Sequence, residues 1–260
     1  MLIRISRWLE RFLYRQSTHL IVNSPAYKNY LIQKGVNPEK ITLIANGTDP
    51  EMFHPGADGK QIRGRFGLEG KFVVTYAGAL GLANDLETLV RAADRLREEP
   101  SVHFLIVGDG KERGGLEAYA RSLKLANMSF IGPRPKDEIP EFLAASDACV
   151  AILKDIPMFR TTYPNKVFDY MAAGRPTILA IDGVIRDVVE SAGGGIFVHP
   201  GDDKAVADAI LSLSRNHELA RTMGARARAH VVRYFNRARQ AELFEDLLTA
   251  LRDGELNTAL

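Results

Sequence analysis

The chain has 260 residues, of which 46% are hydrophobic and 25% charged. This composition is typical of a folded globular protein and excludes a disordered one. The net charge of +2 is too small to attract nucleic acid, so we expect no nucleic-acid partner.

The first fifteen residues have the pattern of a basic amphipathic helix. Arginines interrupt each apolar stretch, so the segment is not a secretory signal. Such a helix can lie on an anionic membrane surface as a peripheral contact, or it can pack on the rest of the fold, which is the interpretation we favour. If Trp8, Phe12 and Leu13 are exposed, we expect them to bind a missing domain, a partner chain or a second copy of this chain.

From residue 19 onward, short apolar runs alternate with longer amphipathic stretches. The runs predict strands at residues 19–23, 41–44, 72–77, 102–107, 128–131, 148–152, 177–180 and 195–198. The stretches predict helices at residues 25–34, 85–98, 111–125, 137–145, 166–173, 184–191, 202–213, 218–232 and 237–251. Continuous apolar strands that alternate with helices indicate an α/β fold with a parallel sheet covered on both faces. Because such crossovers are right-handed, we expect a doubly wound, Rossmann-like sheet.

The same pattern predicts the domain organisation. Residues 71–235 hold enough strand–helix repeats for one Rossmann-like domain, and residues 236–260 add a C-terminal helix and tail. Residues 46–70 are rich in Gly, Pro and Asp and predict a linker. Residues 1–45 supply only two strands, too few for an independent sheet, so we interpret them as the remnant of a preceding domain. The lone Cys149 lies in an apolar run that predicts a buried, inert thiol, as suits a reducing cytoplasm.

Ligands of a doubly wound sheet bind at the carboxyl ends of its strands, where four loops of this chain lie. The first loop contains Gly78, Ala79 and Gly81, and the helix after it directs free N–H groups that suit a phosphate. A tight turn without a ligand is the alternative. The second loop contains Asp109, which is either a turn residue or part of a pocket. This loop begins like a dinucleotide fingerprint, but Arg113 replaces its last glycine, which argues against an oxidoreductase.

The other two loops carry the charged candidates. Arg134 lies between two prolines that stiffen its loop, which either recognises a planar base or forms a surface turn. In the fourth loop, Pro164 suits the first turn of a helix. Lys166 and Asp169 are three residues apart and therefore share one face near the start of that helix. A lysine there opposes the helix dipole, and a bound diphosphate would compensate. A solvated Lys–Asp pair is the alternative.

Four segments, taken in order, resemble the retaining glycosyltransferases of the GT-B fold, in the large group called family four. They are residues 41–55, 76–93, 104–110 and 168–176, and the resemblance covers about residues 18 to 235. It implies that this chain is the donor-binding half of a two-domain enzyme. It also implies catalysis by orientation and by stabilisation of the leaving diphosphate, without a protein nucleophile, so no catalytic residue is assigned.

The resemblance assigns roles to single positions and shows two departures. The family's donor motif is two glutamates separated by seven residues. The second, which holds the ribose hydroxyls, falls on Asp169, and the first, which faces the donor sugar, falls on Thr161. The family's phosphate-binding Arg and Lys fall on Ala79 and Asn84. We therefore expect Lys166, with backbone N–H groups around Gly81 and at Asn165 and Lys166, to neutralise the phosphates.

The Pro-Asn-Lys pattern at residues 164–166 resembles a bacterial subgroup that builds surface polysaccharides from UDP-linked N-acetylated amino sugars. It implies a UDP-sugar donor, a glycan or lipid-linked acceptor, and a location in the cytoplasm or at the inner face of the membrane. The histidines are scattered without ligand spacing, so we expect no metal and no other cofactor. Two alternatives stay open: an inactive nucleotide-binding module or subunit of a split enzyme, and a nucleotide-sugar epimerase. We expect the chain alone to bind UDP weakly and to be inactive.

Overall fold

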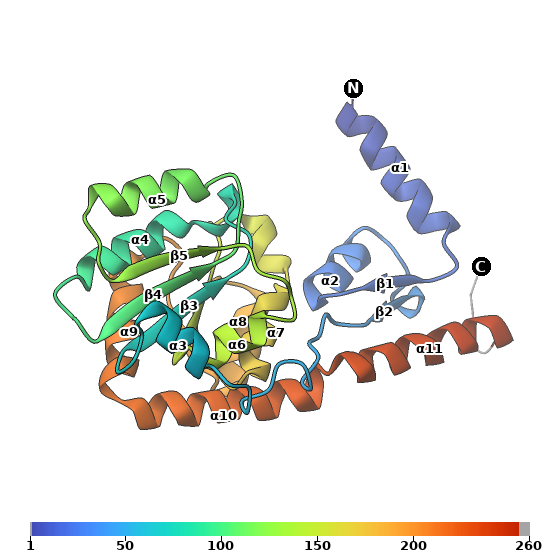
Figure 1. The fold of residues 1–260 in the computed structure, drawn as a ribbon. Helices are drawn as coiled ribbons and strands as arrows, with labels where there is room; N and C mark the ends of the chain where they lie inside the picture. The colour runs from blue at the N-terminus through green and yellow to red at the C-terminus, as the bar shows by residue number, and fades with distance from the viewer. Residues whose placement is uncertain (1, 255–260) are drawn as a thin grey trace.

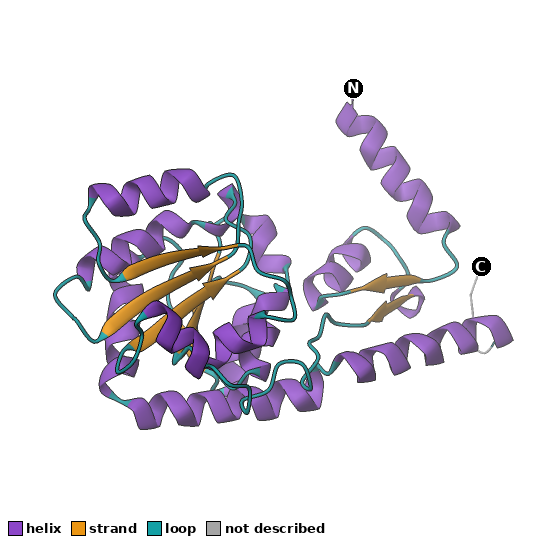
Figure 2. Ribbon diagram, viewed as in Figure 1, coloured by secondary structure: helices purple, strands orange, loops and turns teal. Residues whose placement is uncertain are grey.

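The computed structural model describes residues 2–254 (Figure 1). Met1 and residues 255–260 of the predicted tail lie outside the described residues. The chain forms a large unit with a six-stranded parallel sheet and a small unit with a two-stranded parallel sheet (Figure 2). Helices cover both faces of the large sheet, which confirms the predicted doubly wound α/β fold.

The large sheet has the strand order β5-β4-β3-β6-β7-β8. Every neighbouring pair in it is parallel. The strands are β3 (Phe72–Ala77), β4 (Val102–Val107), β5 (Met128–Gly132), β6 (Ala148–Ile152), β7 (Thr177–Ala180) and β8 (Gly195–Phe197). The order reverses between β3 and β6, so the loops that follow these strands flank the switch point at which ligands bind.

Two apolar clusters fill the two faces of this sheet, because successive side chains of a strand point to opposite faces. Helices α4 (Leu86–Arg95), α5 (Arg113–Ser122) and α9 (Asp203–Arg215) cover one face. The other face is covered by α3 (Lys60–Phe66), α6 (Ile139–Ala144), α7 (Asn165–Ala172), α8 (Val184–Ala192) and the later turns of α10 (His217–Tyr234), whose first turns pack on the first face. Cys149 is fully buried in the second cluster, and burial raises the pKa of its thiol to about 12, as expected of an inert thiol.

The expected linker, residues 46–70, contains more structure than its composition indicates. It includes α3, and three of its side chains, Phe53, Ile62 and Leu68, are buried in the second apolar cluster. These three apolar residues are separated by glycines, one proline and charged residues, so no apolar run marks them in the sequence. The segment is therefore part of the large unit rather than a free connection.

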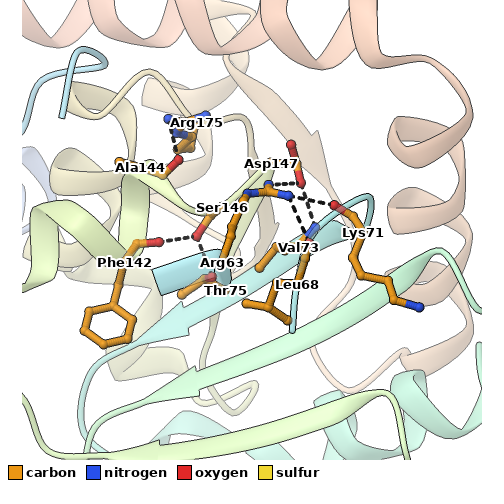
Figure 3. A network of polar contacts seen from close by, with 10 residues as sticks. All are labelled: Arg63, Leu68, Lys71, Val73, Thr75, Phe142, Ala144, Ser146, Asp147 and Arg175. Atoms are coloured by element: carbon orange, nitrogen blue, oxygen red, sulfur yellow. Dashed lines mark hydrogen bonds and ion pairs between the residues drawn. The ribbon is translucent and has the colours of Figure 1, made fainter. Parts of the chain in front are cut away.

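A polar network fixes this segment to the amino ends of the central strands (Figure 3). The guanidinium of Arg63, on α3, donates to the carboxylate of Asp147 at 2.7 Å and to the carbonyl oxygen of Lys71 at 3.0 Å. The same carboxylate accepts from the backbone N–H of Val73, the second residue of β3, at 2.7 Å. This network lies at the end of the sheet opposite to the switch point and so contributes to stability.

The small unit consists of α1 (Leu2–Gln16), β1 (Leu20–Val22), α2 (Pro25–Gln33) and β2 (Ile41–Leu43). Helix α1 has no buried residue and projects from the unit (Figure 1). Among the described residues, one hydrogen bond joins it to α2: the Tyr30 hydroxyl donates to the Glu10 carboxylate at 2.8 Å. We expected this helix to pack on the rest of the fold. Its contacts there are few, and Trp8, Phe12 and Leu13 are all exposed. No helix within residues 2–254 is long and apolar enough to cross a bilayer.

The chain crosses from the small unit to the large unit near Thr48 and leaves the large unit again near Asn236, and these two places lie side by side. Thr48 and Asn236 form an isolated parallel bridge. The Thr48 N–H donates to the Phe235 carbonyl at 3.0 Å, and the Arg237 N–H donates to the Thr48 carbonyl at 2.8 Å. Beyond this bridge, α11 (Arg237–Asp253) extends away from the large unit (Figure 1). The two connections are therefore one hydrogen-bonded structure.

Candidate functional site

A cleft of about 460 Å³ opens at the carboxyl ends of the central strands. The loops after β3, β4 and β5 form its walls together with the first turns of α7. It is lined by Phe53, Ala77, Gly78, Ala79, Val107, Gly108, Asp109, Pro133, Arg134, Lys136, Ile139, Asn165, Lys166 and Asp169. The cleft thus lies at the switch point, where a doubly wound sheet binds its ligand.

Seven of the ten candidate residues line this cleft, namely Gly78, Ala79, Asp109, Arg134, Asn165, Lys166 and Asp169. The other three lie beside it. Gly81 precedes a short helix, η2 (Leu82–Asn84), and lines a separate hollow of about 90 Å³. Pro164 caps the start of α7. Thr161 ends the short helix η3 (Pro157–Thr161), and its carbonyl accepts from the Ser24 hydroxyl of the small unit at 2.6 Å.

The side chain of Lys166 is partly buried in the cleft wall, and within residues 2–254 its ammonium bonds only to uncharged groups. Its Nζ donates to the Tyr76 hydroxyl at 2.7 Å and to the Asn84 side-chain oxygen at 3.1 Å. It also lies 4.3 Å from the centroid of the Tyr76 ring. Burial lowers the pKa of Lys166 to about 8. A buried cation without an acidic partner is unfavourable, so the position suits an anionic ligand.

Two glycines allow the cleft loops to lie close together. Gly78 has a φ of +157°, and a Cβ on it would lie 2.9 Å from Nζ of Lys166. Gly108 has a φ of +139°, and a Cβ on it would lie 1.9 Å from the carbonyl oxygen of Gly78. The Leu80 N–H also donates to the Asp109 carbonyl at 2.8 Å. The loops after β3 and β4 are therefore packed backbone against backbone beneath the ammonium.

Asp169 presents a carboxylate to the same cleft. Its Oδ1 accepts from the hydroxyl of Thr48 at 2.6 Å, and Thr48 is fully buried. Burial raises the pKa of Asp169, and the hydrogen bond from Thr48 and the charges of Lys136 and Arg237 oppose that rise. Lys166 and Asp169 thus share one helical face and one cleft, as the spacing predicts, and they form no solvated pair with each other.

Arg134 contributes a second cation to the wall. Its guanidinium lies 5.9 Å from the Phe142 ring and 3.9 Å from the Glu138 carboxylate. Within residues 2–254, its Nε is buried without a hydrogen-bond partner. Asp109, in the next loop, accepts from the Gly110 N–H at 2.9 Å. Asp109 therefore both forms the turn and lines the cleft, so the two roles that the sequence offered as alternatives occur together.

The sequence did not reveal several residues that support the site. Tyr76 and Tyr170 lie within a predicted strand and a predicted helix and were not singled out, yet the Tyr76 hydroxyl accepts a hydrogen bond from Lys166. The Tyr170 hydroxyl donates to the carbonyl of Ala77 at 3.0 Å and accepts from its N–H at 2.9 Å. A tyrosine in a buried run was the available signal, because a buried hydroxyl needs a partner. Thr48 offered no such signal.

The described part of the chain contains no group of three or more His, Cys, Asp or Glu side chains arranged to hold a metal ion.

Comparisons with known families match most of the chain. Residues 58–230 match the family described as "Glycosyl transferases group 1". Residues 1–52 match the family described as "Glycosyltransferase Family 4". The two matches meet between residues 52 and 58, a few residues after the crossing at Thr48.

Individual relatives and solved structures agree with these families. "Putative colanic acid biosynthesis glycosyl transferase WcaI" of Escherichia coli is 28% identical over 82% of this chain and 54% of its own length. The D-inositol 3-phosphate glycosyltransferase of Stackebrandtia nassauensis is 26% identical over 94% of this chain and 56% of its own length. The chain thus spans about half the length of these curated relatives.

Among solved structures, the crystal structure of Anabaena HepE in complex with UDP superposes with a TM-score of 0.82 at 23% identity. The superposition covers 92% of this chain and 66% of that one. At this level of identity the likeness shows the fold, which is the GT-B Rossmann-like arrangement.

Proposed function

Because the chain belongs to the glycosyl transferases of group 1, we propose that it binds a UDP-sugar in the cleft and serves a retaining sugar transfer. The acceptor is a glycan or lipid-linked glycan of a bacterial surface polysaccharide. The observation that carries this proposal is the partly buried ammonium of Lys166, which has no acidic partner among residues 2–254 and shares one cleft with the Asp169 carboxylate. A diphosphate that is attached to a ribose matches both groups.

In this proposal Lys166 binds the diphosphate. Its Nζ lies 3.1 Å from the side chain of Asn84, the position at which the family resemblance expects a lysine. The ammonium of Lys166 therefore lies where a lysine at position 84 would contact the diphosphate. The backbone N–H groups at the start of α7 add partial positive charge there. With these groups to neutralise the diphosphate, we propose that no metal ion is needed.

The remaining contacts follow from the positions of the lining residues. Asp169 accepts hydrogen bonds from the ribose hydroxyls, and the stiff loop at residues 132–136 contacts the uracil. HepE, a structural neighbour, was crystallised with UDP, which supports a uridine nucleotide. WcaI, by its printed description, acts in colanic acid synthesis, which supports a polysaccharide product. Because both curated relatives are described as transferases, we favour transfer over a binding module without turnover.

We propose that the acceptor is bound by a second domain that packs on the small unit. The chain spans about half the length of its curated relatives. Trp8, Phe12 and Leu13 form an exposed apolar face on α1, and the small unit has only two strands. A further α/β domain, in the same polypeptide or in a partner chain, would cover this face and extend the small sheet.

Isothermal titration calorimetry with UDP, GDP and ADP tests the proposal. We expect weak binding of UDP and weaker binding of GDP and ADP, because the base is read by a rigid loop. We also expect no sugar transfer from UDP-sugars by this chain alone. If none of the three nucleotides releases or absorbs heat, the cleft is not a donor site. If the isolated chain transfers sugar, the second domain is unnecessary.

The affinity for UDP is expected to depend on pH through Lys166. Burial lowers the pKa of its ammonium to about 8, so the free protein loses this charge above that pH. The diphosphate binds the charged form, and its affinity should therefore fall by up to about tenfold per pH unit above 8. Calorimetry between pH 6.5 and pH 9.5 measures the slope. A constant affinity across this range would show that Lys166 does not bind the phosphates.

A further inference from the structure

Thr48 connects the bridge between the two units to the carboxylate in the cleft. Its backbone is fixed on both sides, because its N–H bonds to Phe235 and its carbonyl accepts from Arg237. Its side chain is fully buried, and its hydroxyl donates to Oδ1 of Asp169 at 2.6 Å. The hydroxyl thus comes from a rigid backbone and reaches one oxygen of a functional side chain.

The bond constrains which oxygen of Asp169 meets the ligand. A carboxylate has two oxygens and accepts about four hydrogen bonds. With Oδ1 held by Thr48, no hydrogen bond within residues 2–254 occupies Oδ2, and the residue lines the cleft. Aspartate is one methylene shorter than glutamate, so its carboxylate reaches less far from α7 and depends more on a fixed orientation.

Charged groups around the carboxylate of Asp169 lower its pKa, as the hydrogen bond from Thr48 does. Lys136, from the loop after β5, and Arg237, at the start of α11, both lower the pKa of Asp169, whereas burial raises it. Arg237 is itself held at the bridge, where its guanidinium donates to the Gly47 carbonyl at 2.9 Å. The chain crossing therefore supplies both a hydroxyl and a positive charge to the functional carboxylate.

We infer that Thr48 is a positioning residue of the donor site: its hydroxyl orients the Asp169 carboxylate so that the free oxygen accepts the ribose hydroxyls of the nucleotide. This inference rests on the proposed function. Thr48 does not touch the nucleotide and acts only through Asp169. Loss of the hydroxyl should therefore weaken ligands that carry a ribose and leave ligands without one unaffected.

Calorimetry with UDP and with inorganic pyrophosphate, on the full chain, separates these effects. In Thr48→Val we expect about tenfold weaker binding of UDP, as for a lost hydrogen bond to a charged group, and binding of pyrophosphate within about twofold of the unaltered chain. Thr48→Ser keeps the hydroxyl and should bind UDP within about twofold of the unaltered chain. If Thr48→Val does not fold, Thr48→Ala takes its place in the same measurements.

The matched control is Thr75→Val. Thr75 is equally buried, and its hydroxyl bonds to that of Ser146, away from the cleft (Figure 3). It should leave the affinities for both ligands unchanged. A double-mutant cycle completes the test, because Thr48→Val should have no further effect on UDP once Asp169→Asn is present.

Three results would overturn the inference. In the first, Thr48→Val binds UDP as tightly as the unaltered chain. In the second, Thr48→Val weakens UDP and pyrophosphate equally, which indicates a general disturbance of the cleft. In the third, the effects of Thr48→Val and Asp169→Asn add independently. If the unaltered chain does not bind UDP at all, the proposed function itself fails, and this inference fails with it.

Discussion

Replacing Lys166 with methionine is expected to weaken the binding of UDP by about 1.5–3 kcal/mol. The substitution keeps an apolar side chain of similar length but removes the ammonium, whose hydrogen-bond partners in the described part of the chain are Tyr76 and Asn84. Calorimetry at pH 7, where the ammonium is charged, measures the loss. Lys204→Met is the control, because Lys204 is an exposed lysine that pairs with Asp208 on α9, away from the cleft. An unchanged affinity in Lys166→Met would exclude the lysine from the site.

The same substitution should stabilise the free protein. Burial lowers the pKa of Lys166 from 10.5 to about 8, so the folded state binds this proton less tightly than the unfolded state does. The folded chain is therefore penalised at pH 7, and the penalty fades as the pH rises from about 8 toward 10.5. We expect Lys166→Met to raise the free energy of unfolding at pH 7 by about 1–2 kcal/mol. Urea denaturation at pH 7 and pH 10 measures it, and a gain that grows with pH would contradict the burial argument.

The second large effect is expected for Gly108→Ala, which should lower the free energy of unfolding by about 4 kcal/mol. A Cβ at this position would lie 1.9 Å from the carbonyl oxygen of Gly78, and the φ of +139° already disfavours any side chain. The neighbouring atom belongs to the backbone and cannot rotate away, so the loops after β3 and β4 must separate. Urea denaturation measures the loss of stability, and UDP binding should be lost as well.

Gly67→Ala is the matched control for that substitution. Gly67 ends α3 with a φ of +62°, but a Cβ there would meet nothing within 4 Å. Gly67→Ala therefore measures the cost of a side chain at a positive φ alone. We expect it to lower the free energy of unfolding by about 1 kcal/mol. Equal losses in the two variants would show that the close approach of the cleft loops contributes nothing to stability.

The sheet was predictable because its strands are continuous apolar runs. All six strands of the large sheet begin and end within one residue of the predicted bounds. A strand that is buried on both faces needs apolar side chains at every position, and this requirement is local in sequence. The helices were predicted with larger errors at their ends, because amphipathic patterns extend into the flanking turns. Helix α4, for example, covers Leu86–Arg95 and is shorter at both ends than residues 85–98.

The segment at residues 46–70 and the supports of the site could not be predicted in this way. Phe53, Ile62 and Leu68 are single apolar residues in a turn-rich segment, and nothing local shows that they reach the core. Thr48 lies 121 residues from Asp169, and Tyr76 lies 90 residues from Lys166. The strand order brings these partners together. The sequence therefore indicated most of the side chains that line the cleft, whereas the groups that hold them in place emerge only from the fold.

The bridge between Thr48 and Asn236 has a consequence for motion. The segment that joins the two units passes through it, and the small unit is held at a second place, where the Ser24 hydroxyl donates to the Thr161 carbonyl at 2.6 Å. A rotation of the small unit must therefore turn the bridge and break or bend that hydrogen bond. Asp169 bonds to the same place through Thr48, so a rotation that shifts Thr48 also shifts the carboxylate. For the nucleotide binding that we propose, affinity in the cleft and the orientation of the small unit would then be thermodynamically linked. By reciprocity, the orientation that tightens the binding would be the one that the bound nucleotide stabilises.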